Sequence, residues 1–76
     1  MTRPEHLRWA KQRAFNILNL DSGPTRFREA FTSFLSDLSK HPENKGRYPS
    51  ELMLIGLMAA TAEREAVLRD WIEGFA

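Results

Sequence analysis

The sequence predicts an all-α protein: a small bundle of three or four helices that occupies residues 1–76 as a single domain. Apolar residues recur at helical spacing, and no segment alternates apolar and polar residues as a strand does. Residues 52–60, LMLIGLMAA, form an unbroken apolar run with no polar side to face water. Because 76 residues bury only a small core, we expect a homodimer that helps to cover this run.

The first helix is predicted to begin at Thr2, a cap residue, followed by Pro4 in the first turn and Glu5 three residues after the cap. Its apolar seam consists of Leu7, Ala10, Ala14, Ile17 and Leu18. The segment DSGP at 21–24 supplies the stop, because Gly and Pro do not continue a helix well.

The second helix has the clearest amphipathic pattern. Its apolar stripe consists of Phe27, Ala30, Phe31, Phe34, Leu35 and Leu38. We expect it to end at about Lys40 or His41, because Pro42 disfavours helical geometry in the residue before it. Residues 42–49 are predicted to be a loop.

The third helix is predicted to be capped by Ser50, and a last helix to be terminated by Gly74. A single helix over residues 50–73 competes with a break near Thr61, because one stripe runs through both segments. We favour the break, because Thr61-Ala62-Glu63 resembles a second helix start and because a compact fold needs a turn. The residues of that stripe are Met53, Leu57, Ala60, Val67 and Trp71.

The predicted core combines the aromatic stripe of the second helix with apolar residues of the later helices. Its members are Phe27, Phe31, Phe34, Leu35, Leu38, Leu52, Ile55, Leu57, Val67 and Ile72.

Composition restricts the chemistry. The absence of cysteine excludes disulfides, thiolate metal sites and cysteine nucleophiles. Nucleophile–base pairs, glycine-rich phosphate loops and paired carboxylates are missing too, so we expect no enzyme and no cofactor. The N-terminus lacks a secretory signal, and the apolar run is about half of the roughly 20 residues that span a bilayer. A cytoplasmic protein that does not enter membranes is predicted.

Charge is unevenly distributed. Residues 1–47 carry nine Lys and Arg against five acidic residues, whereas residues 48–76 carry two against five. Nucleic-acid binding by the basic half is therefore an alternative, although the cations of the first helix spread around its circumference. The phosphate contacts would be Arg8, Lys11, Arg13, Arg26, Arg28, Lys45 and Arg47.

Protein contact is the favoured function. Trp9 lies off the apolar seam on the same side as Arg13, and Trp with Arg is the pairing enriched at binding hot spots. Trp71 and Phe75 are further candidate anchors. For each aromatic residue, packing at or within the core is the competing interpretation.

His6 and His41, with Glu5 and Glu43 beside them, would form a metal or proton-transfer site only if two distant segments met, so no metal site is expected. Asp37 is four residues before His41, which favours a local ion pair or end-cap. Asp37, Lys40 and His41 thus form a candidate motif at a helix end.

Three stretches carry a resemblance: residues 5–14, EHLRWAKQRA; residues 36–43, SDLSKHPE; and residues 71–75, WIEGF. Together they cover about 23 of 76 residues, and they resemble a group of short phage- and prophage-encoded proteins that have no established activity. Residues 44–49 and 61–69 match nothing in that group.

The resemblance implies a viral or proviral gene in a bacterial cell, where small phage proteins often act by binding a host protein. The expected function is accordingly an inhibitor or modulator of a host protein, including one of its defence proteins. A minor virion or assembly component is a further alternative.

Overall fold

The computed structural model describes residues 2–20, 22–44 and 46–76, and every regular element within these ranges is helical. The elements are α1 (Arg3–Leu20), α2 (Arg26–Ser39), the short 3-10 helix η1 (Pro42–Asn44), α3 (Ser50–Thr61) and α4 (Glu65–Glu73). The prediction of an all-α bundle is confirmed.

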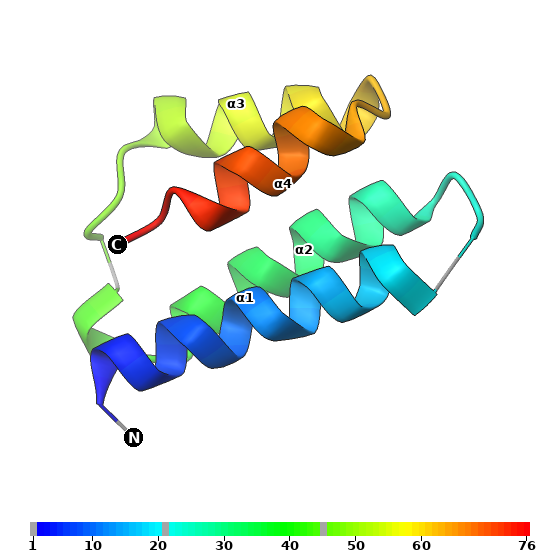
Figure 1. Ribbon diagram of the computed structural model, residues 1–76. Helices are drawn as coiled ribbons and strands as arrows, with labels where there is room; N and C mark the ends of the chain where they lie inside the picture. The colour runs from blue at the N-terminus through cyan, green and yellow to red at the C-terminus, as the bar shows by residue number, and fades with distance from the viewer. Residues whose placement is uncertain (1, 21, 45) are drawn as a thin grey trace.

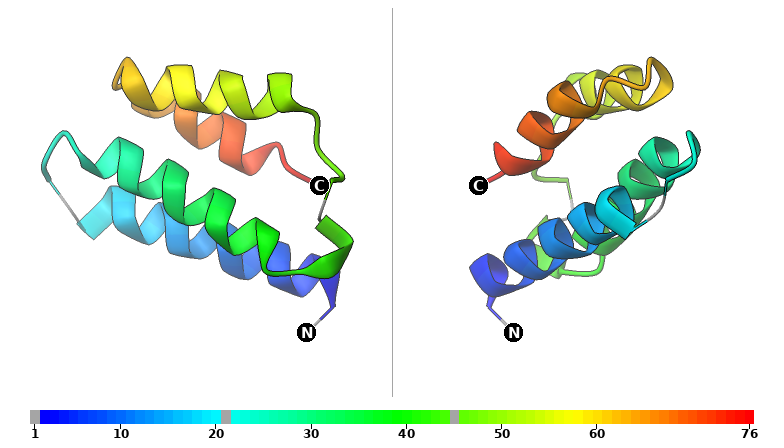
Figure 2. Two further views of the ribbon diagram at one scale, coloured as in Figure 1. Left: turned by 180° about the vertical axis from the view of Figure 1, so that it is seen from behind. Right: turned by 45° about the vertical axis from the view of Figure 1, so that its right-hand side comes forward.

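The helices form two antiparallel hairpins stacked in two layers. α1 and α2 make one layer, α3 and α4 make the other, and both chain ends lie at the same end of the molecule (Figure 1). The rear and side views show the same arrangement (Figure 2). α1 packs mainly on α2, which also packs on α3, so α2 is the central helix.

The start of α1 is the capping box that the sequence predicts. The Thr2 backbone N–H donates to Glu5 Oε1 at 3.2 Å, and the Glu5 N–H donates back to Thr2 Oγ1 at 3.4 Å. The Thr2 hydroxyl also donates to Glu5 Oε1 at 2.7 Å. This side-chain hydrogen bond lowers the pKa of Glu5.

The core lies between the two hairpins. The α1–α2 contact is close because it is made by alanines, Ala10, Ala14 and Ala30, each with no exposed surface. The aromatic residues of α2 face the second hairpin. The largest fully buried apolar side chains are Phe34, Leu68 and Ile72.

α3 and α4 approach each other closely at Gly56. A Cβ atom added there would lie 2.5 Å from the Trp71 ring, which occupies that space. The ring is held in place because its Nε1–H donates to the Leu52 carbonyl at 2.8 Å. Gly56 is therefore required for packing, although a glycine lowers helix propensity.

A break separates α3 from α4, as favoured from the sequence. The Glu63 N–H donates to Ala60 O at 3.2 Å and the Arg64 N–H donates to Ala59 O at 3.0 Å, which is the hydrogen-bond pattern of a Schellman motif. Glu63 has φ 56°, a left-handed conformation that usually belongs to glycine. The next helix begins at Glu65, not at residues 61–63 as their cap-like sequence suggests.

The predicted ends of α2 and α4 agree with the structure, whereas the predicted start of α3 and the loop before it differ. α2 ends at Ser39 with Lys40 as its C-cap, and α4 ends at Glu73 with Gly74 as its C-cap, both close to prediction. Ser50 is wrong as a cap: it is the first residue of α3, Pro49 precedes it, and no side chain caps the helix. The predicted loop at 42–49 begins with η1.

The core prediction is wrong at Ile55, Leu57 and Val67, which are exposed. Leu35 and Leu52 are only partly buried. For the α3 residues the reason is that α3 is apolar on all sides, so its composition does not indicate which side faces inward. The small residues Gly56, Ala59 and Ala60 occupy the inner side. Val67 lies on α4, which turns Leu68, Trp71 and Ile72 inward instead.

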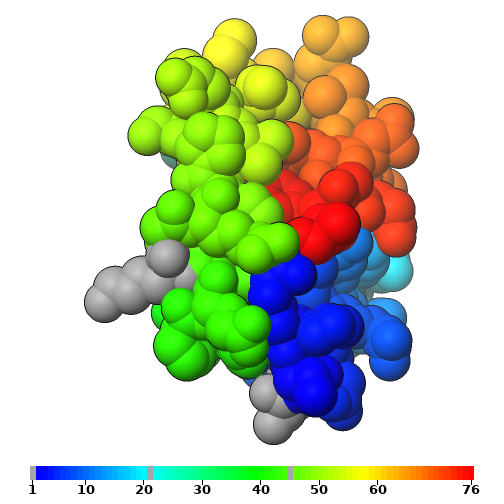
Figure 3. Space-filling view, turned by 90° about the vertical axis from the view of Figure 1, so that its left-hand side faces the viewer, coloured from blue at the N-terminus to red at the C-terminus, as the bar shows by residue number. Residues whose placement is uncertain are grey.

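Segments from both hairpins meet at the end of the molecule that carries the termini (Figure 3). Arg3 Nε donates to Asn44 Oδ1 at 3.0 Å, and its guanidinium also donates to the Tyr48 hydroxyl at 2.6 Å and to Ala76 O. Lys11 Nζ donates to the carbonyls of Glu73 and Phe75 at 2.8 and 2.6 Å. These contacts fasten the segment after α4 to α1.

Candidate functional site

The outer side of α3 exposes four large apolar side chains that no other part of the described chain covers. Leu54, Ile55, Leu57 and Met58 are exposed by 54, 53, 45 and 63%, and we call these four residues the α3 face. Isolated exposed apolar residues are ordinary, but four on one 12-residue helix form a contiguous patch of the kind found at interaction sites.

The α3 face is held rigidly by the packing behind it. The inner side of α3 rests on the Trp71 ring at Gly56. Behind Trp71, the rings of Phe34 and Phe75 make edge contacts with it at centroid distances of 5.7 and 4.8 Å. The helix cannot turn its outer residues inward, because the space is already filled with aromatic side chains.

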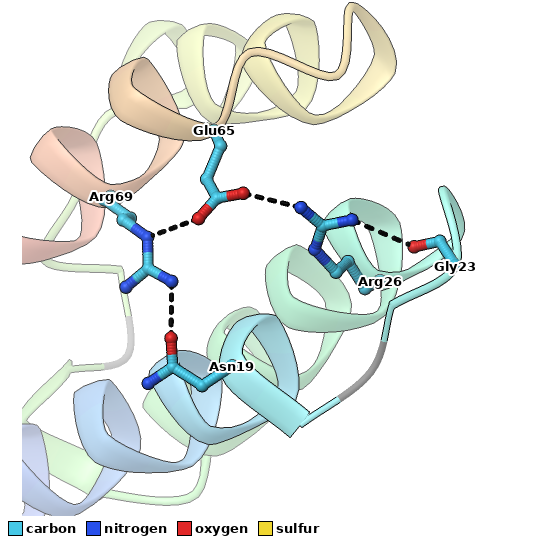
Figure 4. A network of polar contacts seen from close by, with 5 residues as sticks. All are labelled: Asn19, Gly23, Arg26, Glu65 and Arg69. Atoms are coloured by element: carbon cyan, nitrogen blue, oxygen red, sulfur yellow. Dashed lines mark hydrogen bonds and ion pairs between the residues drawn. The ribbon is translucent and has the colours of Figure 1, made fainter.

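A polar network joins the two hairpins at the end opposite the termini (Figure 4). Glu65 accepts from Arg26 at 2.6 Å and from Arg69 at 2.9 Å, and Arg69 donates in turn to Asn19 Oδ1 at 2.5 Å. Arg26 also donates to the Gly23 carbonyl at 3.4 Å. The hydrogen bonds from Arg26 and Arg69 lower the pKa of Glu65.

Trp9 and Arg13, both proposed as interaction residues, lie together at a corner between α1 and α2. The Arg13 guanidinium carbon is 4.9 Å from the Trp9 ring centre, and Lys40 Nζ is 5.8 Å from the same ring. The Trp9 ring is partly buried and packs against the core. We call Trp9, Arg13, Asp37 and Lys40 the α1–α2 corner.

Asp37 is the buried charge of the α1–α2 corner, with 1% of its surface exposed. It accepts from Arg13 Nε at 2.8 Å and from Lys40 Nζ at 3.1 Å. The predicted Asp37–His41 pair is wrong, because Arg13 and Lys40 occupy the carboxylate. The Nδ1 atom of His41 instead accepts from the Glu43 N–H at 3.2 Å.

A shallow groove of about 480 Å³ runs beside the corner along α2. Three cations, Arg13, Arg28 and Lys40, line it, together with the acidic Glu29 and Asp37. Since two of these cations are already paired with Asp37, the groove offers little uncompensated positive charge. The remaining lining residues carry hydroxyl groups: Thr32, Ser33 and Ser36.

Trp71 and Phe75, the other two proposed anchors, are buried in the core, at 8 and 5% exposed surface. Their packing is the alternative that the sequence also allowed. A partner cannot reach these rings in this conformation, so they do not belong to the same surface as Trp9.

The structure brings His6 and His41 together, with ring centroids 5.2 Å apart, which no local pattern in the sequence indicated. His6 is 7% exposed, and neither of its ring nitrogens has a hydrogen-bond partner among the described residues. Burial lowers the pKa of His6, and the neighbouring His41 lowers it further. No group of three or more His, Asp or Glu in the described part of the chain is placed to hold a metal ion.

The cations proposed for nucleic-acid binding do not form one free surface. Lys11 binds carbonyls near the chain end, Arg13 pairs with Asp37 and Arg26 pairs with Glu65. In the described ranges, the side chains of Arg8, Arg28 and Arg47 make no hydrogen bond or ion pair. Lys45 lies outside the described residues.

None of the described helices is long and apolar enough to cross a bilayer, and α3 has 12 residues where roughly 20 are needed. A scan against protein-family models found no match, and neither did searches of curated proteins and of solved structures.

Proposed function

We propose that this protein is a small helical interaction module, which acts by contact with other proteins in a bacterial host cell and catalyses no reaction. The observation that supports the proposal most is the α3 face: four large apolar side chains are exposed on one helix. We further propose that the α3 face joins two copies into a homodimer.

An estimate of the free energy favours a dimer of modest affinity. The exposed fractions of the four side chains add up to about two fully exposed side chains per protomer. Burying one such side chain contributes roughly 1.5–3 kcal/mol, so covering the face on both protomers contributes on the order of 6–12 kcal/mol. Association itself costs about 4–15 kcal/mol. Dimerisation in the micromolar range or weaker is expected.

Light scattering over a concentration series tests the dimer. The expected result is a mass that rises with concentration from 8.8 kDa towards twice that value. Met58→Lys places a charge on the α3 face and should keep the protein monomeric. Leu20→Lys is the matched control, because Leu20 is 86% exposed but belongs to α1. A mass that stays at 8.8 kDa at high concentration would refute the homodimer.

The proposed target is a host protein, and the α1–α2 corner is the surface proposed to meet it. The corner combines a partly buried tryptophan with Arg13 and Lys40 beside the ring, a composition typical of binding hot spots. Arg13→Ala should reduce the amount of host protein retained from a lysate, compared with Arg47→Ala as a control. Equal retention by both variants would reject the corner as the binding surface.

A further inference from the structure

The proposed homodimer leaves open how the two α3 helices are oriented. We propose that they pair antiparallel about a two-fold axis, with Glu51 of each protomer beside the partner's Arg64. This proposal rests on the proposed function, since it requires the dimer, and it adds the orientation and the charged contacts of the interface.

The outer side of α3 has its only charge at one end. Glu51, Leu54, Ile55 and Met58 follow the i, i+3, i+4, i+7 spacing, so they form one stripe along the helix. All four are exposed. Glu51 begins the stripe, and the three apolar residues continue it across the middle of the helix.

The other end of α3 carries an exposed cation. Arg64 follows the turn after α3, and its side chain makes no hydrogen bond or ion pair with any described residue. The neighbouring Glu63 lines a pocket with Pro24, Thr25 and Arg28, which places it on the side of α2. Arg64 is therefore the cation available at this end of α3.

Charge decides between the two possible orientations. Parallel pairing would bring Glu51 next to the partner's Glu51 and align the two helix dipoles side by side. Antiparallel pairing brings Glu51 towards the partner's Arg64 at both ends and opposes the dipoles, and both effects are favourable. It also places Leu54 opposite the partner's Met58, so the apolar parts of the two stripes coincide.

Antiparallel pairing about this axis leaves the α1–α2 layers on the outer sides of the dimer, because α3 lies in the opposite layer (Figure 1). Each dimer would then present two copies of the α1–α2 corner. A target with two binding sites would be held more tightly by such a dimer than by a monomer.

Cross-linking through introduced thiols tests the orientation. The chain has no cysteine, so Glu51→Cys and Ala62→Cys each carry a single thiol, and both positions are exposed. Eleven residues separate the two positions by about 16 Å at the helical rise, whereas a disulfide requires Cα atoms about 4.4–6.8 Å apart. Antiparallel pairing predicts a mixed disulfide when the two variants are oxidised together, and little disulfide when either is oxidised alone.

The possible results distinguish the antiparallel orientation of the α3 helices from the homodimer itself. Self-cross-linking of each variant would establish parallel pairing and overturn the proposal while the dimer stands. Absence of any cross-link in a protein that light scattering shows to be dimeric would overturn it too. A monomer at all concentrations would refute both proposals and leave the α3 face to another protein.

Reversing the charges of Glu51 and Arg64 and measuring the dimer dissociation constant gives a second test. Glu51→Arg and Arg64→Glu should each weaken dimerisation about tenfold, because the two-fold axis places each change in both charged contacts. The double variant restores opposite charges and should return to within about threefold of the original dissociation constant. Arg28→Glu changes the net charge as Arg64→Glu does but lies on α2, and it should have little effect. Double-variant dimers as weak as those of the single variants would overturn the proposed contact.

Discussion

The two hairpins bury their apolar residues in opposite ways. In the α1–α2 hairpin, amphipathic helices turn apolar residues inward, and alanines let the helices approach closely. In the α3–α4 hairpin, α3 turns its small residues Gly56, Ala59 and Ala60 inward and leaves larger ones outside. Periodicity therefore indicates the buried side only where the helix has a polar side to exclude.

The difference has a structural cause. Trp71 of α4 takes the space next to α3, so only a residue without a side chain fits at Gly56. The bulk of the core on this side is contributed by α4 and α2. α3 covers them with its small residues and leaves its larger apolar side chains exposed.

Truncation of an apolar residue should have a large effect between the hairpins and a small one on the α3 face. Phe34 is fully buried between the hairpins, and Phe34→Ala should lower the free energy of unfolding by about 3–5 kcal/mol. Leu54→Ala on the α3 face should change it by less than about 1 kcal/mol in dilute solution, where the protein is monomeric. Urea denaturation measures both. Equal losses would mean that Leu54 is packed within the monomer.

Gly56→Ala tests the close packing of α3 against α4 in the second hairpin. Helix propensity alone favours alanine by about 1 kcal/mol, but the added Cβ would overlap the Trp71 ring. We expect a net loss of about 1–3 kcal/mol in the free energy of unfolding. Ser36→Ala, at an exposed position on α2, is the control and should be close to neutral or stabilising. A stabilised Gly56→Ala protein would contradict the close approach.

A smaller, pH-dependent effect is expected in the first hairpin. Burial and His41 hold the pKa of His6 below its ordinary value of 6.5. The unfolded chain therefore takes up a proton at a higher pH than the folded one, and stability should fall as the pH falls below about 6.5. The nearby Asp37 opposes this shift and Lys40 adds to it.

Denaturation of the wild type and His6→Phe between pH 8 and 5 measures this effect. The variant should lose less stability on acidification, whereas His41→Gln retains the buried imidazole and should still respond to pH. Parallel profiles of wild type and His6→Phe would exclude His6 as the source.

The smallest expected effect lies in the turn between α3 and α4. Glu63 adopts a left-handed conformation that costs a non-glycine residue about 1 kcal/mol. Glu63→Gly should raise the free energy of unfolding by roughly 0.5–1 kcal/mol, measured by thermal or urea denaturation. Glu43→Gly, on the 3-10 helix after α2, is the control and should not stabilise. A destabilised Glu63→Gly protein would contradict the assigned turn.

Most contacts between separate helices in the candidate site could not be predicted from the sequence. Trp9 and Arg13 were paired correctly, because residues four apart share a helix face. Arg13 and Asp37, 24 residues apart, meet only because α1 and α2 are antiparallel, and this contact replaced the predicted Asp37–His41 pair. The contact of His6 with His41 was missed for the same reason.

The helices and most of their ends follow from the amino-acid sequence alone, because caps, proline, glycine and periodicity act within a few residues. The sequence also shows that residues 52–60 carry more apolar surface than a chain of 76 residues readily covers. Which side of α3 is exposed depends instead on the packing of the helices. That side depends on where Trp71 packs, and such a contact between separate helices leaves no signal in a helix that is apolar all round.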